Sequence, residues 1–411
     1  MRHIHEMTVR HHEALAALED AIEPLGNTEN VVLLACANRI AARDIVATRL
    51  VPPADNSAVD GFAFAHADLK ATAQTLGISM RLPAGISEVK DLPRGTAAQI
   101  FTGAPLPPGA DTVAMQEDCR VSGETIQVPA DIPKGMNCRK SGTDMQPGQP
   151  LLKSGRRIRP ADIAALASQG IRSLEVAKAP RVAVFSTGDE LIQPGTSQGI
   201  GQVFDSNRPM LNALLEHWPC RVEDAGRLPD NADTVERALR QAATKADVIV
   251  ATGGASAGEE DHTACALAKL GSSIVSGIAI KPGHPLQIGR IGSCVVVALP
   301  GNPVAAFVCA LLYLRPLLYR LSGAPFPQPK AVLLPAAFQI ELKKPDRREF
   351  YRGIPKIETD VIVEVEKFSP DSSALISGLQ AAGGLIEIPE ETTKIERGEL
   401  VRYLPFQEFD L

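Results

Sequence analysis

The sequence predicts a multidomain protein built around a doubly wound α/β domain, with smaller β-rich regions before and after it. Its 411 residues are long for one hydrophobic core, and usual domain sizes predict two to four domains. Three short, continuously apolar segments between residues 181 and 299 alternate with amphipathic ones, which indicates a parallel sheet covered on both faces. Short apolar runs between Pro- and Gly-rich turns predict β structure in residues 51–144 and after Pro325.

Helices are expected in residues 6–50, because His12–Leu18 and Val31–Leu34 have helical rather than alternating apolar spacing. A further helix is expected at Pro160–Leu166, with Gly170 as its stop. Four histidines near the N-terminus are candidate metal ligands: His3, His5, His11 and His12. A frayed, solvated helix is the simpler interpretation of that group.

The central region carries the parallel sheet. Its predicted strands are Val182–Phe185, Val248–Val250 and Val295–Val297, and each is followed by a turn that contains glycine. Residues 208–216 and 231–245 are amphipathic and predict helices between the strands. Ligands bind beyond the carboxyl ends of the strands in such sheets, so the three turns predict a binding edge.

The turn after the second strand is rich in glycine: Thr252, Gly253, Gly254, Ala255, Ser256, Ala257 and Gly258. Glycines allow successive backbone N–H groups to point into one concavity, which favours an anion such as a phosphate. A plain tight turn is the competing interpretation. Carboxylates crowd the same edge: Asp189, Glu190, Glu259, Glu260 and Asp261. Carboxylates beside phosphates commonly hold Mg²⁺, which is the favoured interpretation of the group, although for any one of these residues a solvated acidic loop is favoured.

Positive charge follows farther along the chain. Lys281 and His284 lie on a Pro- and Gly-stiffened loop, and Asn302-Pro303 begins an apolar helix with Asn as N-cap and Pro at the first position. The free N–H groups of that helix start would face the same edge. The apolar run Val304–Leu314 is expected to end at Arg315-Pro316, and is too short for a membrane span of about 20 residues.

Composition narrows the range of partners. A formal net charge of −6 and an aromatic content of 4% argue against nucleic-acid binding. Seven scattered cysteines form no CxxC pair, so reduced thiols are expected rather than disulfides or zinc. No signal-peptide pattern is visible at the N-terminus, which favours a cytoplasmic protein without a membrane anchor.

The segments named above, with two polar stretches of the N-terminal β region, resemble the molybdopterin molybdenumtransferase (MoeA) family, which includes the E domain of gephyrin and its plant counterpart. The motifs occur in the family's order along nearly the whole chain: Asp55-Asn56-Ser57 with Asp60-Gly61, Thr102–Pro107, Gly142-Thr143-Asp144, Ser186–Leu191, Asp205-Ser206-Asn207, Gly253–Gly258, Lys281-Pro282-Gly283, Leu299–Pro303 and Phe350–Gly353.

The resemblance implies four domains and a homodimer with the active site between subunits. The expected parts are an elongated helical domain from residues 1–50 and 145–178, an inserted β domain from 51–144, a MogA-like α/β domain from 179–326 and a C-terminal β domain from 327–411. The implied reaction inserts molybdate into adenylated molybdopterin and releases AMP, with a divalent cation such as Mg²⁺.

The resemblance also assigns residues. The implied catalytic carboxylates are Asp60, Asp144, Glu190, Asp230 and Asp261, of which Glu190 and Asp261 would hold the metal. The implied pterin-phosphate site comprises Thr187, Gly188, Thr252, Gly253, Gly254, Ser256, Gly258, Pro300 and Asn302. Molybdate would be gathered by Lys281, His284 and Arg352 through charge and hydrogen bonds.

Three positions depart from the family pattern. Many relatives have Lys where this chain has His284, Ser where it has Ala305, and a large residue such as Tyr where it has His262. The first two changes remove a fixed positive charge and a hydroxyl donor near the oxyanion site. Two alternatives to the enzyme therefore stay open: a non-catalytic molybdopterin- or nucleotide-binding paralogue, and a scaffold protein.

Overall fold

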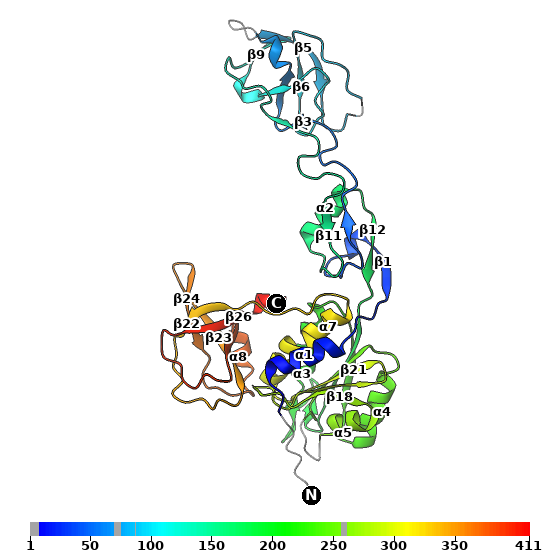
Figure 1. The fold of residues 1–411 in the computed structure, drawn as a ribbon, viewed down its shortest axis with the longest axis vertical. Helices are drawn as coiled ribbons and strands as arrows, with labels where there is room; N and C mark the ends of the chain where they lie inside the picture. Colours follow the sequence, from blue (N-terminus) through cyan, green and yellow to red (C-terminus); the bar gives the residue numbers. More distant parts are fainter. Residues whose placement is uncertain (1–7, 70–74, 87, 256–260) are drawn as a thin grey trace.

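The computed structural model is elongated, with an α/β body and a C-terminal sheet at one end and a separate β sheet at the other (Figure 1). It describes residues 8–69, 75–86, 88–255 and 261–411. Ser256 and Gly258 of the expected phosphate site, Glu259 and Glu260 of the acidic run, and the N-terminal His3 and His5 lie outside the described residues.

The α/β body is a six-stranded sheet of order β16-β13-β17-β21-β20-β18. Its strands are β13 (Arg181–Thr187), β16 (Arg221–Leu228), β17 (Val248–Thr252), β18 (Ser272–Ser276), β20 (Gln287–Ile291) and β21 (Cys294–Leu299). The first four strands in this order, β16 to β21, run parallel to one another, as the apolar runs predicted. Strands β20 and β18 add antiparallel strands at one edge. Every residue of β17 and β21 is buried, which explains why those runs are apolar throughout.

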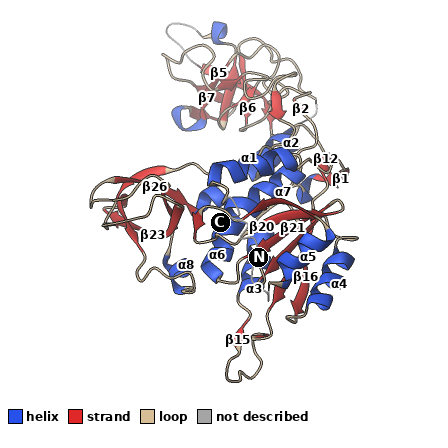
Figure 2. Ribbon diagram, turned by 60° about the horizontal axis from the view of Figure 1, so that its bottom comes forward, coloured by secondary structure: helices blue, strands red, loops and turns tan. Residues whose placement is uncertain are grey.

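Helices cover both faces of this sheet (Figure 2). One face packs on α4 (Ala232–Ala242) and α5 (His262–Leu270) through Val235, Leu239 and Leu267. The other face shares its hydrophobic cluster with α1 (His11–Ala21), α3 (Asn207–Glu216), α6 (Pro303–Cys309) and α7 (Arg315–Leu321). The doubly wound architecture expected from the sequence is thereby confirmed.

The helix that begins at Pro303 is longer than the sequence indicated. A π-helical segment, Ala310–Leu314, joins α6 to α7, so the helix continues past Arg315-Pro316, where the apolar run ends, and is not too short for a membrane span. Pro316 has no N–H to donate inside this helix, and the π-helical segment directly before it is the kind of irregularity that accommodates a proline. Among the described helices, Pro303–Leu321 alone is long and apolar enough to cross a membrane. Its most apolar stretch is 89% buried within the protein, as in a core helix.

The C-terminal sheet has the order β19-β23-β25-β26-β22, with β24 also paired to β23. Its strands are β19 (Ile280–Lys281), β22 (Val332–Pro335), β23 (Arg348–Glu358), β24 (Val361–Lys367), β25 (Gly384–Ile388) and β26 (Leu400–Pro405). The short helix α8 (Ser377–Ala381) and a 3-10 turn (Phe406–Phe409) complete this part. Strand β19 leaves the α/β body and pairs with β23, so the Lys281 loop bridges the two sheets.

The sheet at the far end has the order β7-β4-β6-β5-β9-β8. Its strands are β4 (Gly61–Phe64), β5 (Thr75–Leu82), β6 (Thr96–Ile100), β7 (Thr112–Met115), β8 (Arg120–Ser122) and β9 (Thr125–Gln127). Short ladders connect it to the α/β body, pairing β1 (Thr28–Val32) with β12 (Ser173–Ala177), β2 (Ile45–Val46) with β11 (Pro150–Leu152) and β3 (Asn56–Ser57) with β10 (Cys138–Arg139). Helix α2 (Pro160–Ser168) is where the sequence placed it, and Gly170 follows with φ of 73°.

Two expectations for the N-terminal segment were wrong. Residues Val31 and Val32 end strand β1, and Leu33–Ala35 forms only a 3-10 turn, so Val31–Leu34 is not helical. β-Branched residues favour strands, and a short apolar run does not distinguish the two structures by period alone. His11 is not solvated either: it is 7% exposed, while the adjacent His12 is exposed.

Candidate active site

A cavity of about 290 Å³ lies at the carboxyl edge of the parallel strands, between the turns that follow β13, β17 and β21. Eight predicted site residues line it together: Thr187, Gly188, Glu190, Asp230, Gly253, Gly254, Asp261 and Pro300. We refer to it as the acidic cavity. The position agrees with the rule that open parallel sheets bind ligands beyond their carboxyl ends.

The glycines of the acidic cavity are required by its backbone. Gly253 has φ of 96°, and a Cβ there would lie 2.5 Å from the carbonyl oxygen of Thr187. Gly254 has φ of 61° and packs against Thr263. The buried hydroxyls of Thr187 and Thr263 have no hydrogen-bond partner among the described residues. Two such hydroxyls beside a left-handed turn form a cradle suited to phosphate oxygens.

Local hydrogen bonds place the three carboxylates. The backbone N–H of Asp189 donates to Asp230 over 3.1 Å, and that of Asp230 donates to Asp189 over 3.2 Å, which holds Asp230 at the end of β13. Asp261 occupies the N-cap position of α5, and Glu190 follows the turn at Gly188. Their juxtaposition at one cavity is the arrangement that the sequence predicted, including Asp230, which lies in the least distinctive motif.

Beneath the cavity, Thr252 and Asn207 connect the turns. The side-chain amide of Asn207 donates to the hydroxyl of Thr252 over 2.8 Å and to the carbonyl of Gly301 over 2.7 Å. Thr252 is 1% exposed, so it supports the cradle rather than lining it. Asn207 was not among the predicted site residues, although it lies in a motif shared with the family. Its position at the start of an amphipathic helix suggested only a helix terminus.

A second cavity, of about 390 Å³, lies between the α/β body and the C-terminal sheet, and we call it the basic cavity. Its lining includes Lys281, His284, Arg352 and Asn302. The first three are the residues that were expected to bind the oxyanion. The parallel pairing of β19 with β23 aligns Lys281 with Glu349, three residues before Arg352. The cations therefore come from two sheets that meet at this point.

The two strongest cations of the basic cavity are held by carboxylates. The ammonium of Lys281 lies 3.7 Å from Glu349 and 3.6 Å from Asp371. Arg352 is 3% exposed, lies 3.6 Å from Asp371, and donates to the carbonyl of Leu375 over 3.0 Å. Burial lowers the pKa of Arg352, while the negative charge of Asp371 opposes that shift.

Two of the three departures from the family pattern fall in this cavity. Nδ1 of His284 lies 2.8 Å from the carbonyl of Ile278, so this nitrogen is the N–H donor. Ala305 is 3% exposed and lines the cavity near the start of α6, where it offers no hydroxyl. Asn302 is the N-cap of α6 as predicted, although its side chain makes no capping hydrogen bond. His262 begins α5, next to Asp261 of the acidic cavity.

The acidic and basic cavities adjoin, because Pro285 and Pro300 line both. Asp60 and Asp144 are not brought to them within this chain. Asp60 precedes β4 in the far sheet and accepts hydrogen bonds from the backbone and hydroxyl of Thr102, both over 2.7 Å, which lower its pKa. Asp144 is exposed between β10 and β11, where its N–H donates to the carbonyl of Val51 over 2.9 Å; Figure 1 shows how far the sheet at that end lies from the α/β body.

Comparison with known families covers most of the chain. Residues 9–170 match the MoeA N-terminal region (domain I and II), residues 183–320 match a probable molybdopterin binding domain, and residues 335–406 match the MoeA C-terminal region (domain IV). A molybdopterin molybdenumtransferase of Haemophilus influenzae is 35% identical over 381 residues, which are 92% of this chain and 94% of that protein. The chain belongs to the MoeA family.

Other MoeA relatives agree over similar lengths. Molybdopterin molybdenumtransferase 2 of Mycobacterium tuberculosis is 31% identical over 402 residues, covering 94% of this chain and 96% of its own. A crystal structure of the molybdopterin biosynthesis MoeA protein of Pyrococcus horikoshii has a TM-score of 0.78 at 31% identity, and covers 97% of this chain and 99% of that one. The multidomain MoeA architecture expected from the sequence is thus confirmed.

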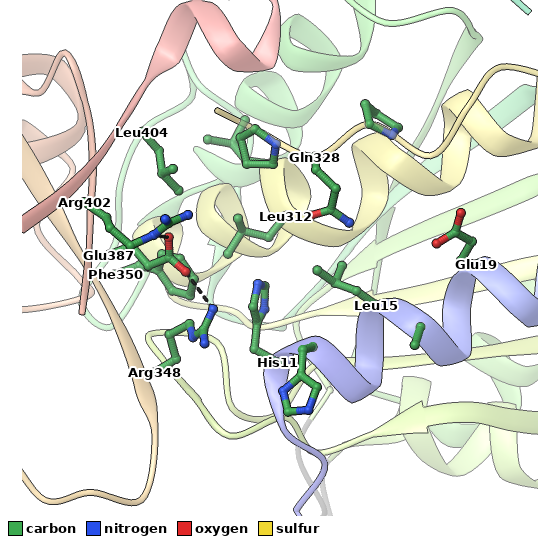
Figure 3. A pocket seen from close by; sticks show the side chains of 15 residues that line it. His11, Leu15, Glu19, Leu312, Gln328, Arg348, Phe350, Glu387, Arg402 and Leu404 are labelled. Carbon is green, nitrogen blue, oxygen red and sulfur yellow. Dashed lines mark hydrogen bonds and ion pairs between the residues drawn. The ribbon is translucent and has the colours of Figure 1, made fainter. Parts of the chain in front are cut away.

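This MoeA protein has a further cavity, of about 300 Å³, where α1 meets the C-terminal sheet (Figure 3). Arg348 donates to Glu387 over 2.7 Å, and Arg402 donates to the same carboxylate over 2.8 Å. Nδ1 of His11 lies 2.7 Å from the hydroxyl of Tyr313 in the π-helical segment. The paired charges lie within the C-terminal sheet, whereas the buried imidazole of His11 packs against Phe350 and so joins α1 to the strand that carries Arg352.

Proposed function

We propose that this protein is a molybdopterin molybdenumtransferase, which inserts molybdate into the dithiolene of adenylated molybdopterin and releases AMP. One observation carries the proposal: the acidic, glycine-lined cavity and the basic cavity share Pro285 and Pro300. A phosphoanhydride held in the first cavity would therefore lie beside an oxyanion held in the second. The names of the relatives from Haemophilus influenzae and Mycobacterium tuberculosis support the same reaction.

The residues of the acidic cavity would bind the phosphate groups of the substrate. Gly253 and Gly254 form the turn that lines the cavity, and the hydroxyl of Thr187 supplies a donor without giving up another bond among the described residues. Asn207 keeps the turns after β17 and β21 at a fixed separation. Fixed donors stabilise developing negative charge without reorganisation during the reaction.

The basic cavity would hold the molybdate substrate. Lys281 and Arg352 provide charge, and Arg352 also provides a planar set of N–H donors suited to a tetrahedral oxyanion. His284, Asn302 and Pro300 shape the rest of the wall, between these cations and the phosphate cradle. The role of these residues is to bring the oxyanion close to the pterin and to hold it there.

Mg²⁺ fits the donor set of the acidic cavity. No group of three metal-ligating side chains lies close enough to bind an ion alone within the described ranges. Mg²⁺ is nevertheless usually held by one or two carboxylates together with substrate phosphates, and Glu190, Asp230 and Asp261 line the phosphate cradle. We assign Glu190 and Asp261 as the protein ligands. When bound, the ion would polarise the phosphoanhydride.

A homodimer would complete the site. Asp60 and Asp144 lie in or below the far sheet, remote from both cavities of the same chain (Figure 1). In a two-fold dimer of elongated chains, the far sheet of one subunit can reach the cavities of the other. The domain division into residues 1–50 with 145–178, 51–144, 179–326 and 327–411 belongs to the same proposal.

We place the protein in the cytoplasm, with small molecules as its substrates and with neither nucleic acid nor membrane as a partner. All seven cysteines are free, as is usual for a reducing compartment. The apolar helix Pro303–Leu321 is accounted for as a core element of the α/β body, because its side chains belong to the cluster shared with α1 and α3.

The test is molybdate-dependent AMP release from adenylated molybdopterin by the purified protein with Mg²⁺. We expect release that saturates with molybdate in the natural protein and is lost in Asp261→Asn, which retains a good N-cap for α5. Asp233→Asn, a charge change on the exposed first turn of α4, is the matched control and should release AMP normally. Tight nucleotide binding without release would instead identify a binding paralogue, and an Asp261→Asn protein with normal turnover would refute the site.

A further inference from the structure

Asp371 occupies a position between the two main cations of the basic cavity. Its carboxylate oxygens lie 3.6 Å from the ammonium of Lys281 and 3.6 Å from the guanidinium of Arg352. Asp371 lines the cavity itself, and its side chain is 32% exposed, so water reaches it from the open side. A carboxylate in this position contacts the same two donors that an incoming oxyanion would use.

Charge balance gives this arrangement a consequence. Lys281 and Arg352 contribute two positive charges, whereas Glu349 and Asp371 contribute two negative ones, so this ion-paired group is neutral overall. A neutral group attracts an anion weakly at distances beyond the contacts themselves. Arg347 also lines the cavity and is paired with Asp346 at 3.9 Å. Lys281 and Arg352 therefore become available to an entering anion only when Asp371 turns away.

Neither cation depends on Asp371 for its position. Arg352 donates to the carbonyl of Leu375 over 3.0 Å, and its guanidinium lies 4.8 Å from the ring centroid of Phe368. Lys281 is held through the β19–β23 pairing and by Glu349. The loop that carries Asp371 is itself anchored, because the N–H of Val304 donates to the carbonyl of Ser373 over 3.1 Å. The side chain can therefore rotate outward while the loop and both cations stay in place.

We propose that Asp371 is an internal competitor of the oxyanion substrate, whose carboxylate occupies Lys281 and Arg352 until the substrate displaces it. Asp371 thereby sets the affinity of the basic cavity for molybdate. The inference rests on the proposed function, because it takes molybdate as the anion that enters here. In the absence of substrate the buried guanidinium keeps a partner, which avoids leaving a desolvated cation uncompensated.

The experiment measures molybdate binding to the purified full-length protein by calorimetry at fixed ionic strength. Asp371→Asn should bind molybdate about tenfold more tightly than the natural protein, the combined effect of two partly exposed ion pairs. The matched control is Asp233→Asn, which removes the same charge from an exposed residue in the first turn of α4 that does not line the cavity. Its affinity should stay within about twofold of the natural protein, because salt screens exposed charges.

The competitor role of Asp371 is refuted if Asp371→Asn binds molybdate as weakly as the natural protein or more weakly. Weaker binding is what a role in positioning Lys281 and Arg352 would predict. Asp371→Ser also removes the carboxylate and repeats the measurement should the amide variant fold poorly. Parallel assays of AMP release separate the two proposals. If the natural protein releases AMP normally with molybdate, but Asp371→Asn shows unchanged or absent molybdate binding, only the competitor role of Asp371 is overturned. If Asp371→Asn binds molybdate more tightly, but the natural protein releases no AMP, only the transferase activity is overturned.

Discussion

Acidification should loosen the junction between α1 and the C-terminal sheet through His11. Burial, reinforced by the nearby Arg348 guanidinium, lowers the pKa of His11 from 6.5 to about 4, although Glu387 and Glu390 act in the opposite direction. The folded protein therefore keeps this imidazole neutral at pH values where the unfolded chain has already bound a proton. The neutral ring contacts the Tyr313 hydroxyl and packs edge-on against Phe350.

The sign and size of the effect follow from proton linkage. Between pH 6.5 and about 4 the unfolded state binds more protons at His11 than the folded state, so the free energy of unfolding falls as the pH falls. The stability that the folded protein derives from a neutral His11 is fully present above pH 6.5 and fully lost below about pH 4. A shift of this size corresponds to about 3 kcal/mol over the whole window, with a maximum slope of about 1.4 kcal/mol per pH unit.

Urea unfolding followed by tryptophan fluorescence measures this directly. Trp218 is the sole tryptophan, is 3% exposed, and belongs to the same hydrophobic cluster as α1. His11→Asn removes the titrating group while keeping a polar atom near Tyr313, so its unfolding free energy should depend less on pH than that of the natural protein. His12→Asn, one residue away and exposed, is the control and should follow the natural protein. Parallel curves for the natural protein and His11→Asn between pH 6.5 and about 4 would refute the reasoning.

Two further predictions concern the active site. Ala305→Ser restores a hydroxyl donor beside the start of α6 and should tighten molybdate binding by about three- to tenfold, measured by calorimetry, because one added hydrogen bond is worth about 1 kcal/mol; an unchanged affinity would show that this position does not face the anion. Asp60→Asn and Asp261→Asn should each be inactive alone, yet their mixture after subunit exchange should recover about a quarter of the natural rate of AMP release, since half of the dimers are hybrids with one intact site. No recovery after verified exchange would exclude a site shared between subunits.

The α/β body and much of the site could be predicted because their signals are local. Strands buried on both faces are apolar throughout, and the turns that follow such strands in a parallel sheet meet at one edge. Glu190 and Asp261 could therefore be placed at one edge from sequence, although 71 residues separate them in the chain, whereas Asp230 was assigned by the family resemblance alone. The glycines at 253 and 254 were recognisable for a similar reason, since each has a positive φ that other residues rarely adopt.

The features that sequence reasoning missed depend on contacts between distant segments. Asp371 follows Ser369-Pro370 in what looks like an ordinary turn, and only the fold brings it to Lys281, 90 residues earlier. His11 looked like part of a solvated helix because its cover comes from Tyr313 and Phe350. Val31 and Val32 became a strand because β12, far along the chain, supplies their hydrogen-bonding partners.

The pairing of β19 with β23 limits how this architecture can be divided. Two residues, Ile280 and Lys281, carry the chain out of the α/β body into register with Arg348 and Glu349. A chain truncated before the C-terminal sheet would keep the phosphate cradle but lose Arg352 and the strand that aligns Lys281. Grafting that sheet onto another nucleotide-binding domain would require transplanting the loop as well. The proposed oxyanion site would thus depend on the pairing of β19 with β23, and neither domain would carry it alone.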